Sequence, residues 1–142
     1  MKSKDTLISE AILKDNGYRV TSGRIALLTF LRNIKKPVTV KDVQEELTYS
    51  IDKVTLYRAL EDFTQSKIVI KINLQSPVTY YEFLYKDHHH HHIICEKCGK
   101  IEDITTCNQH SLQKEMLTKS HNFKSITSHS LEFFGICKTC TQ

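Results

Sequence analysis

The chain has 142 residues, of which 39% are hydrophobic and 25% charged, and this balance excludes a disordered polymer. Nothing at the N-terminus resembles a signal peptide and no apolar run is long enough to cross a bilayer, so we expect a cytoplasmic protein without a membrane partner. The formal net charge of +4 is compatible with nucleic-acid binding but does not establish it.

Four helices are predicted in the first part of the chain. Apolar residues recur at helical spacing before Asn16-Gly17, which ends the first helix. Helical patterns follow in 21–34, 39–47 and 50–67, with Thr39 and Asp52 as predicted N-caps of the last two. The apolar residues of these patterns are Leu7, Ile8, Ala11 and Ile12; Ile25, Leu28 and Leu31; Val40, Val43 and Leu47; and Leu56, Leu60 and Phe63.

After the fourth helix the periodicity changes to that of a strand. The segments 67–74 and 78–85, separated by the letters QSP, predict a β-hairpin. Helices followed by a hairpin predict a winged helix-turn-helix. Further along we expect a short strand, a turn at Gly99 and a second strand within 92–104, then a helix within 108–121 and a long strand within 123–137.

Metal-binding residue types are confined to one side of the chain. All eight histidines and all five cysteines follow residue 86. We therefore expect an α+β chain of two domains, a winged helix at 1–85 and a small metal-rich α/β domain at 86–142. In a reducing cytosol, cysteines favour metal binding over disulfides.

Two Cys-x-x-Cys pairs carry the most specific pattern in the sequence. They are Cys95 with Cys98 and Cys137 with Cys140. Four thiolates suit tetrahedral Zn²⁺, and a site filled by sulfur leaves no open position, so we expect a structural zinc that contributes to folding. Cys107 has no partner at a useful spacing, and we interpret it as a small, half-buried residue rather than a ligand or a redox thiol.

Five consecutive histidines, His88 to His92, precede the first cysteine pair. On an extended strand, His89 and His91 share one face, here called the odd face, while His88, His90 and His92 share the even face. One strand can thus serve two separate metal sites, and such sites of imidazole and carboxylate suit Fe²⁺, Mn²⁺, Co²⁺, Ni²⁺ or Zn²⁺. The further potential ligands are Glu82, Asp103, His110, His121 and His129, of which His121 is interpreted as a surface or capping residue.

The fourth helix has the features of a DNA-recognition helix. Thr55, Tyr57 and Arg58 lie off its apolar stripe near its N-terminus, the end that meets base edges and phosphates in the major groove. Arg19, Arg24 and Lys53 add positive charge at helix ends. The alternative interpretation is a solvated polar face on an ordinary helical bundle.

Four motifs spread over nearly the whole chain resemble the ferric uptake regulator (Fur) superfamily of bacterial metal-responsive repressors. They are "GYRVTSGRIALL", "KVTLYRALEDFTQSKIV", "HHHHHIICEKCGKIEDI" and "SHSLEFFGICKTC". The resemblance implies a homodimer paired through its C-terminal halves, with two winged helices on a palindromic operator in double-stranded DNA. It places Arg19 at a minor-groove contact and Tyr57 and Arg58 at major-groove contacts.

The resemblance also implies three metal sites. The first is structural zinc at Cys95, Cys98, Cys137 and Cys140. The second, a regulatory site on the odd face, joins His89, His91 and His129 with a ligand from the following helix, which we place at His110. The third, a hinge site on the even face, joins Glu82, His90 and His92 with Asp103. The regulatory metal expected is Fe²⁺ or Zn²⁺, with Mn²⁺, Ni²⁺ or Co²⁺ as alternatives.

The sequence departs from the family pattern at two ligand positions. Lys36 or Pro37 stands where many members carry a hinge histidine, and His91 stands where iron sensors often carry aspartate. The nitrogen-rich ligand set favours zinc or nickel over iron. Because the hinge histidine is missing, the odd face becomes the expected sensor. The absent histidine argues against the peroxide-sensing members, which oxidise it.

The function expected is therefore a metal-dependent repressor of metal uptake and homeostasis genes, with no enzymatic activity and no small-molecule substrate. Metal would fix the spacing of two recognition helices that otherwise sample many hinge angles. Three alternatives are a peroxide-sensing regulator of the same family, a histidine-rich storage or chaperone protein, and a metalloenzyme with a two-histidine, one-carboxylate centre. A storage or chaperone protein needs no winged helix. A metalloenzyme would need an acid–base pair, and the sequence shows none apart from the candidate metal ligands.

Overall fold

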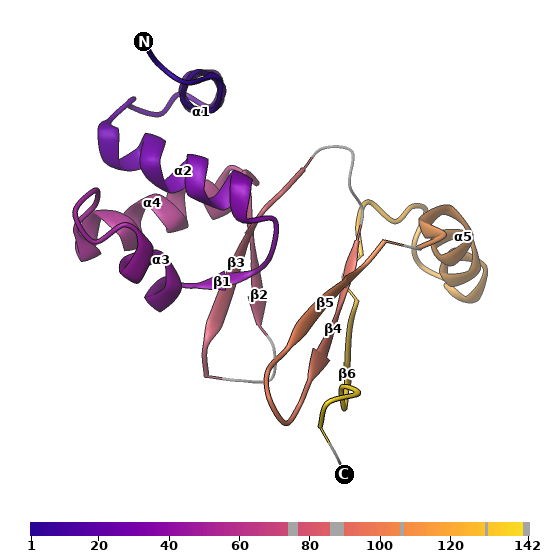
Figure 1. Ribbon diagram of the computed structural model, residues 1–142. Helices are drawn as coiled ribbons and strands as arrows, with labels where there is room; N and C mark the ends of the chain where they lie inside the picture. The colour runs from indigo at the N-terminus through magenta and orange to yellow at the C-terminus, as the bar shows by residue number, and fades with distance from the viewer. Residues whose placement is uncertain (74–76, 86–89, 106, 130, 141–142) are drawn as a thin grey trace. The chain divides into compact units, whose positions relative to one another are not determined.

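The computed structural model describes the whole chain except residues 74–76, 86–89, 106, 130 and 141–142, which are drawn in grey in Figure 1. The chain divides into two compact units, Met1–Leu84 and Tyr85–Gln142. The division falls one residue before the predicted boundary between residues 85 and 86. Every helix in the described part of the chain is too short or too polar to span a lipid bilayer.

Four helices form the bulk of the first unit (Figure 1), and the residue immediately before each helix caps it with its side chain. They are α1 (Lys4–Asp15), α2 (Ser22–Ile34), α3 (Val40–Glu46) and α4 (Lys53–Gln65). The predicted caps are confirmed, because Thr39 accepts from the Asp42 N–H in a capping box and Asp52 accepts from the Thr55 N–H. Each cap satisfies a backbone donor that the first helical turn leaves unpaired.

The core of the first unit lies between α2 and α4. Leu28, Leu31, Leu56, Leu60 and Phe63 are all buried there, as their spacing predicts. Burial of such side chains contributes about 1.5–3 kcal/mol each relative to leaving them in water. This packing holds α4 by its apolar stripe and leaves the opposite side of that helix exposed.

The first helix forms as predicted but turns a different face to the core. Leu7 is 52% exposed, whereas Ser9 and Leu13 are fully buried. The Ser9 hydroxyl hydrogen-bonds the Thr29 hydroxyl of α2 at 2.8 Å, so a polar pair occupies the contact. Periodicity alone does not select the face, because a helix with few strongly apolar residues offers two overlapping stripes.

A three-stranded antiparallel sheet completes the first unit, in the order β1-β3-β2 (Figure 1). The predicted hairpin is confirmed as β2 (Val69–Asn73) and β3 (Thr79–Phe83), with Val69 opposite Phe83. The strand β1 (Val38–Thr39) pairs with the other edge of β3 and was not predicted, since two residues are too short to show a period.

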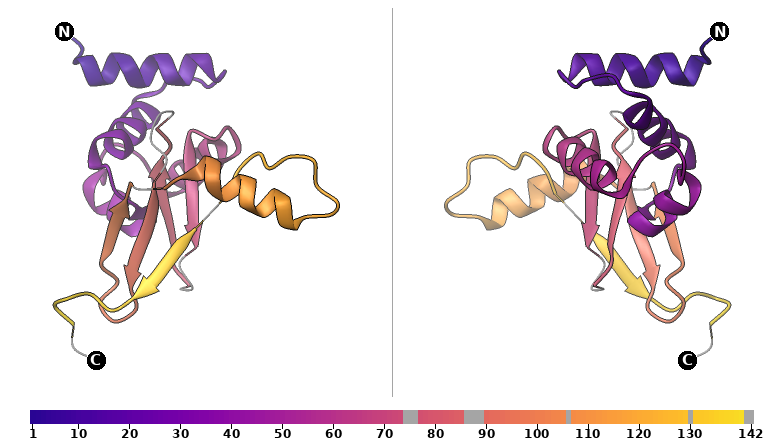
Figure 2. Two further views of the ribbon diagram at one scale, coloured as in Figure 1. Left: turned by 90° about the vertical axis from the view of Figure 1, so that its right-hand side faces the viewer. Right: turned by 90° about the vertical axis from the view of Figure 1, so that its left-hand side faces the viewer.

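The second unit is built on a three-stranded sheet in the order β5-β4-β6. Its elements are β4 (His91–Cys95), β5 (Ile101–Ile104), α5 (Gln109–Lys119) and β6 (Glu132–Gly135). β5 pairs antiparallel with β4 after the predicted turn, in which Gly99 adopts a φ of +74°. β6 pairs parallel with the other edge of β4. Figure 2 shows α5 projecting away from this sheet, and none of its residues is buried.

The long strand predicted within 123–137 is wrong in its length. Among the described residues of this range, only Glu132–Gly135 forms a strand, and the ladder to β4 starts at the pair His92 and Glu132. A strand extends only as far as a neighbour supplies hydrogen bonds, and β4 itself begins at His91. The alternation of residues 123–129 therefore has no such neighbour among the described strands.

Candidate metal centres and nucleic-acid interface

The four cysteines of the two Cys-x-x-Cys pairs meet at one end of the second unit's sheet. Cys95 ends β4, and the parallel register sets it opposite Gly135, two residues before Cys137. All four Sγ atoms lie within 4.8 Å of one another. Cys98 Sγ and Cys137 Sγ are 3.6 Å apart, and tetrahedral zinc with bonds of about 2.3 Å sets its sulfurs about 3.8 Å apart. The group therefore has the composition and compactness of a zinc site made of four thiolates.

Hydrogen bonds to the sulfurs already favour thiolate at two of these cysteines. The Thr139 hydroxyl lies 3.1 Å from Cys137 Sγ and lowers the pKa of Cys137 to about 6. The Cys137 N–H donates to Cys95 Sγ at 3.4 Å and lowers the pKa of Cys95. The adjacent Cys137 sulfur raises the pKa of Cys140 to about 12. A metal cation binding here would displace the proton that Cys140 retains at neutral pH.

The histidines of β4 alternate between the two faces of the sheet, as expected for a strand. His91 Nε2 lies 3.2 Å from His129 Nε2, and their rings are 5.0 Å apart between centroids. His92 Nε2 lies 3.6 Å from Asp103 Oδ1 across the β4–β5 ladder. Both histidines are buried. One strand therefore contributes to two distinct groups of ligands.

The group around His91 contains a residue for which the sequence predicted no metal role. Cys107 Sγ lies 3.8 Å from His129 Nε2, and His91, Cys107 and His129 each offer one ligand atom within 4.8 Å of the others. His110 is exposed, and no group of three or more such ligands among the described residues includes it. His89 lies outside the described residues.

The group around His92 contains the second unit's predicted even-face ligands. His90 and His92 are in edge-to-face contact with ring centroids 5.1 Å apart, and Asp103 lies beside His92. Glu82, the remaining predicted ligand, lies on β3 of the first unit, opposite Ile70 of β2. Glu82 is buried, and the other residues of its strand are Thr79, two tyrosines and Phe83.

The polar side of α4 is exposed along the predicted contact residues. Lys53, Tyr57 and Arg58 point away from the core, and Tyr57 is 48% exposed. The Thr55 hydroxyl donates to the Asp52 carboxylate, so part of its hydrogen-bonding capacity serves the cap. Val54, 61% exposed, lies on the same side and was not predicted. An exposed apolar residue beside basic ones can contact a thymine methyl group. The position of Val54 off the apolar stripe could have indicated this role from the sequence.

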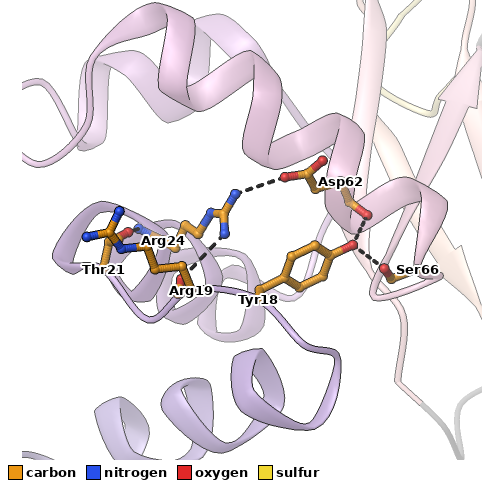
Figure 3. Close-up of polar contacts among 6 residues, drawn as sticks. All are labelled: Tyr18, Arg19, Thr21, Arg24, Asp62 and Ser66. Atoms are coloured by element: carbon orange, nitrogen blue, oxygen red, sulfur yellow. Dashed lines mark hydrogen bonds and ion pairs between the residues drawn. The ribbon is translucent and has the colours of Figure 1, made fainter.

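Arg24, predicted as a DNA contact, is engaged within the first unit (Figure 3). Its guanidinium donates to Asp62 of α4 at 2.9 Å and lies 5.4 Å from the centre of the Tyr18 ring. The Tyr18 hydroxyl in turn donates to the Asp62 carbonyl at 2.6 Å and contacts Ser66. Arg24 and Tyr18 therefore tie α2 and the loop before it to α4. Arg19, beside them in sequence, is exposed.

Replacing Arg24 with glutamine is expected to lower the free energy of unfolding by about 1 kcal/mol, because it removes a partly buried ion pair and a cation–π contact. Urea unfolding of Arg24→Gln, Asp62→Asn and the double variant measures the coupling between the two side chains. Additive losses would show that the pair contributes nothing, and Lys41→Gln, in an exposed pair with Glu45, is the matched control.

Comparison with known proteins gives consistent matches. The model of the ferric uptake regulator family matches residues 15–134. The ferric uptake regulation protein of Yersinia pestis is 34% identical over 131 residues, which are 89% of this chain and 86% of that protein. The peroxide operon regulator of Bacillus subtilis is 29% identical over 133 residues, which are 92% and 89% of the two chains. The structure of the ferric uptake regulator from Francisella tularensis with iron is similar at a TM-score of 0.72 and 28% identity, over 87% of this chain and 95% of that chain.

Proposed function

Since the chain belongs to the ferric uptake regulator family, we propose that it is a repressor that binds operator DNA when its regulatory metal is bound. Members of this family are metal-responsive transcription regulators and not enzymes. The genes proposed to be under its control are those of metal uptake and homeostasis.

The observation that carries the proposal is the divided role of β4, in a chain that also has a winged helix. Successive residues, His91 and His92, enter two ligand groups, and Cys95 at the end of the same strand enters a third. Because one strand contributes to all three ligand groups, metal binding at the histidine groups would affect the same strand that the four-cysteine group holds in place. A storage protein would need neither that coupling nor an exposed recognition helix.

The metals proposed are Zn²⁺ at the four cysteines and Fe²⁺ or Zn²⁺ at the histidine groups. Thiolates suit zinc, while imidazole with carboxylate suits several divalent ions. From the sequence motifs we also propose that Glu82 joins His90, His92 and Asp103 as a hinge ligand. Metal there would restrict the winged helix relative to the second unit, so that fewer conformations compete with the DNA-bound one.

The second unit is proposed to pair with a second copy of itself. Ile93 and Phe133 are register partners on β4 and β6, and they are 40% and 50% exposed. Adjacent exposed apolar side chains of this size are typical of an interface. A homodimer would present two α4 helices to the two halves of a palindromic operator.

A peroxide-sensing role is the second candidate, favoured by the similarity to the Bacillus subtilis regulator. The absence of histidine from residues 1–85 argues against it, since the winged helix then offers no imidazole for metal-catalysed oxidation. Operator binding of the metal-loaded protein before and after exposure to peroxide separates the two candidates, because only a peroxide sensor would lose binding.

Removing the regulatory metal while the structural zinc stays in place is expected to lower operator affinity at least about tenfold, through loss of the restricted conformation. Operator DNA is selected from a random library by the metal-loaded protein, and binding is measured by gel shift before and after mild chelation. Zinc content is assayed at each step. Unchanged affinity in protein that keeps only its structural zinc would refute the proposal, and restoration by one added metal would identify the metal sensed.

A further inference from the structure

Cys107 is the one cysteine outside the two Cys-x-x-Cys pairs, and the proposed function assigns it no role. It lies three residues after the end of β5 and immediately before Asn108, the N-cap of α5. Its N–H donates to the Thr105 carbonyl at 3.1 Å. Its half-buried sulfur comes within 3.8 Å of the His129 ring.

The sheet order explains why three residues distant in sequence meet here. β4 is the central strand, and His91 at its start pairs with Ile104, the last residue of β5. Cys107 thus leaves the neighbouring strand three residues beyond the partner of His91. His129 arrives on the other edge, three residues before Glu132, which pairs with His92. The central strand therefore receives a thiol from one neighbour and an imidazole from the other.

The distances within the group fit a metal ion. Bonds of about 2.0 Å to nitrogen and 2.3 Å to sulfur at tetrahedral angles separate two nitrogens by about 3.3 Å and a nitrogen from a sulfur by about 3.5 Å. The Nε2 atoms of His91 and His129 are 3.2 Å apart, and Cys107 Sγ is 3.8 Å from Nε2 of His129. Both distances are close to those expected for ligands of one ion, and the ligand atoms of all three residues lie within 4.8 Å of one another.

We propose that Cys107 is a metal ligand, so that the odd-face regulatory site is a thiolate site of His91, Cys107 and His129. This inference rests on the proposed function for the site's role but not for its ligands. A thiolate among imidazoles shifts preference toward Zn²⁺ and Co²⁺ and away from the harder Fe²⁺ and Mn²⁺. The metal sensed is accordingly Zn²⁺ or an ion of similar ligand preference such as Co²⁺. Without metal, the same three groups would form a hydrogen-bonded triad.

Cobalt binding tests whether the Cys107 thiolate is a ligand, because Co²⁺ bound to thiolate gives a charge-transfer absorption that Co²⁺ bound to nitrogen and oxygen does not. Protein that keeps one structural zinc per chain is titrated with Co²⁺, and zinc content is measured before and after. The wild type is expected to show one equivalent of thiolate-bound cobalt. Cobalt at the His90, His92 and Asp103 group adds no such band.

Cys107→Ser is expected to abolish the band and to weaken cobalt binding at this site at least about tenfold, as expected for loss of a direct ligand. Cys107→Asp is expected to bind cobalt without the band, which separates a lost ligand from a misfolded domain. His129→Ala should lose the site while the structural zinc stays.

A band of undiminished strength in Cys107→Ser at constant zinc content would overturn the inference, as would a wild type that shows none. Operator binding by the same proteins is measured separately. A wild-type protein that shows the cobalt band but no metal-dependent DNA binding would refute the proposed function and leave the ligand assignment standing.

Discussion

Replacing Cys137 with serine is expected to release the structural zinc and unfold the second unit, while the first unit keeps its structure. Structural zinc in small domains contributes an apparent free energy of about 10–16 kcal/mol at neutral pH. A whole domain is usually stable by only about 5–15 kcal/mol, so loss of the ion removes a free energy as large as the stability of an ordinary domain.

The burial pattern explains why the loss should be confined to one unit. Among the described residues of the second unit, only four are buried, namely His91, His92, Ile94 and Cys95, and three of them are proposed metal ligands. The hydrophobic core cluster, by contrast, lies entirely in the first unit. With so little apolar burial, the second unit depends on its metal, as very small domains do.

Zinc stoichiometry and circular dichroism of Cys137→Ser test this prediction, with thermal unfolding followed for loss of one of two transitions. Cys107→Ser is the matched control, because it makes the same chemical change outside the four-cysteine group. In protein stripped of its labile metal, that control should retain one zinc per chain. A folded, zinc-free second unit in Cys137→Ser would show that the four cysteines do not carry its stability.

Replacing Arg58 with alanine is expected to abolish most operator affinity. A bidentate arginine–guanine contact contributes about 1–3 kcal/mol, and a homodimer would lose it in both half-sites, about 2–6 kcal/mol in all. The fold should tolerate the change, because Arg58 is exposed on α4 while Leu56, Ala59 and Leu60 hold that helix to the core.

Fluorescence anisotropy with the selected operator and with an unrelated duplex separates base readout from phosphate binding. Loss on the operator alone indicates a base contact, whereas loss on both, with a shallower salt dependence, indicates a phosphate contact. Gln65→Ala is the control, since Gln65 is exposed at the far end of the same helix. Equal affinity in Arg58→Ala and Gln65→Ala would remove α4 as the recognition helix.

Local patterns in the sequence determined much of the first unit. The caps at Thr39 and Asp52, the apolar stripe of α4 and the hairpin all depend on residues a few positions apart, so their physics is visible along the chain. The Cys-x-x-Cys pairs are similar, because a knuckle around a metal is itself a local structure. Period two in the histidine run likewise predicted that neighbouring histidines enter different groups.

Tertiary structure decided what depends on a neighbour distant in sequence. The buried face of α1 follows from the polar contact of Ser9 with Thr29, and the short β6 follows from where β4 begins. Cys107 is the clearest case. Its spacing from every other cysteine suggested an isolated thiol, because spacing along the chain does not show which distant residues the fold brings together. The sheet order β5-β4-β6 brings it to His91 and His129, and only that order makes three dispersed residues a candidate metal site.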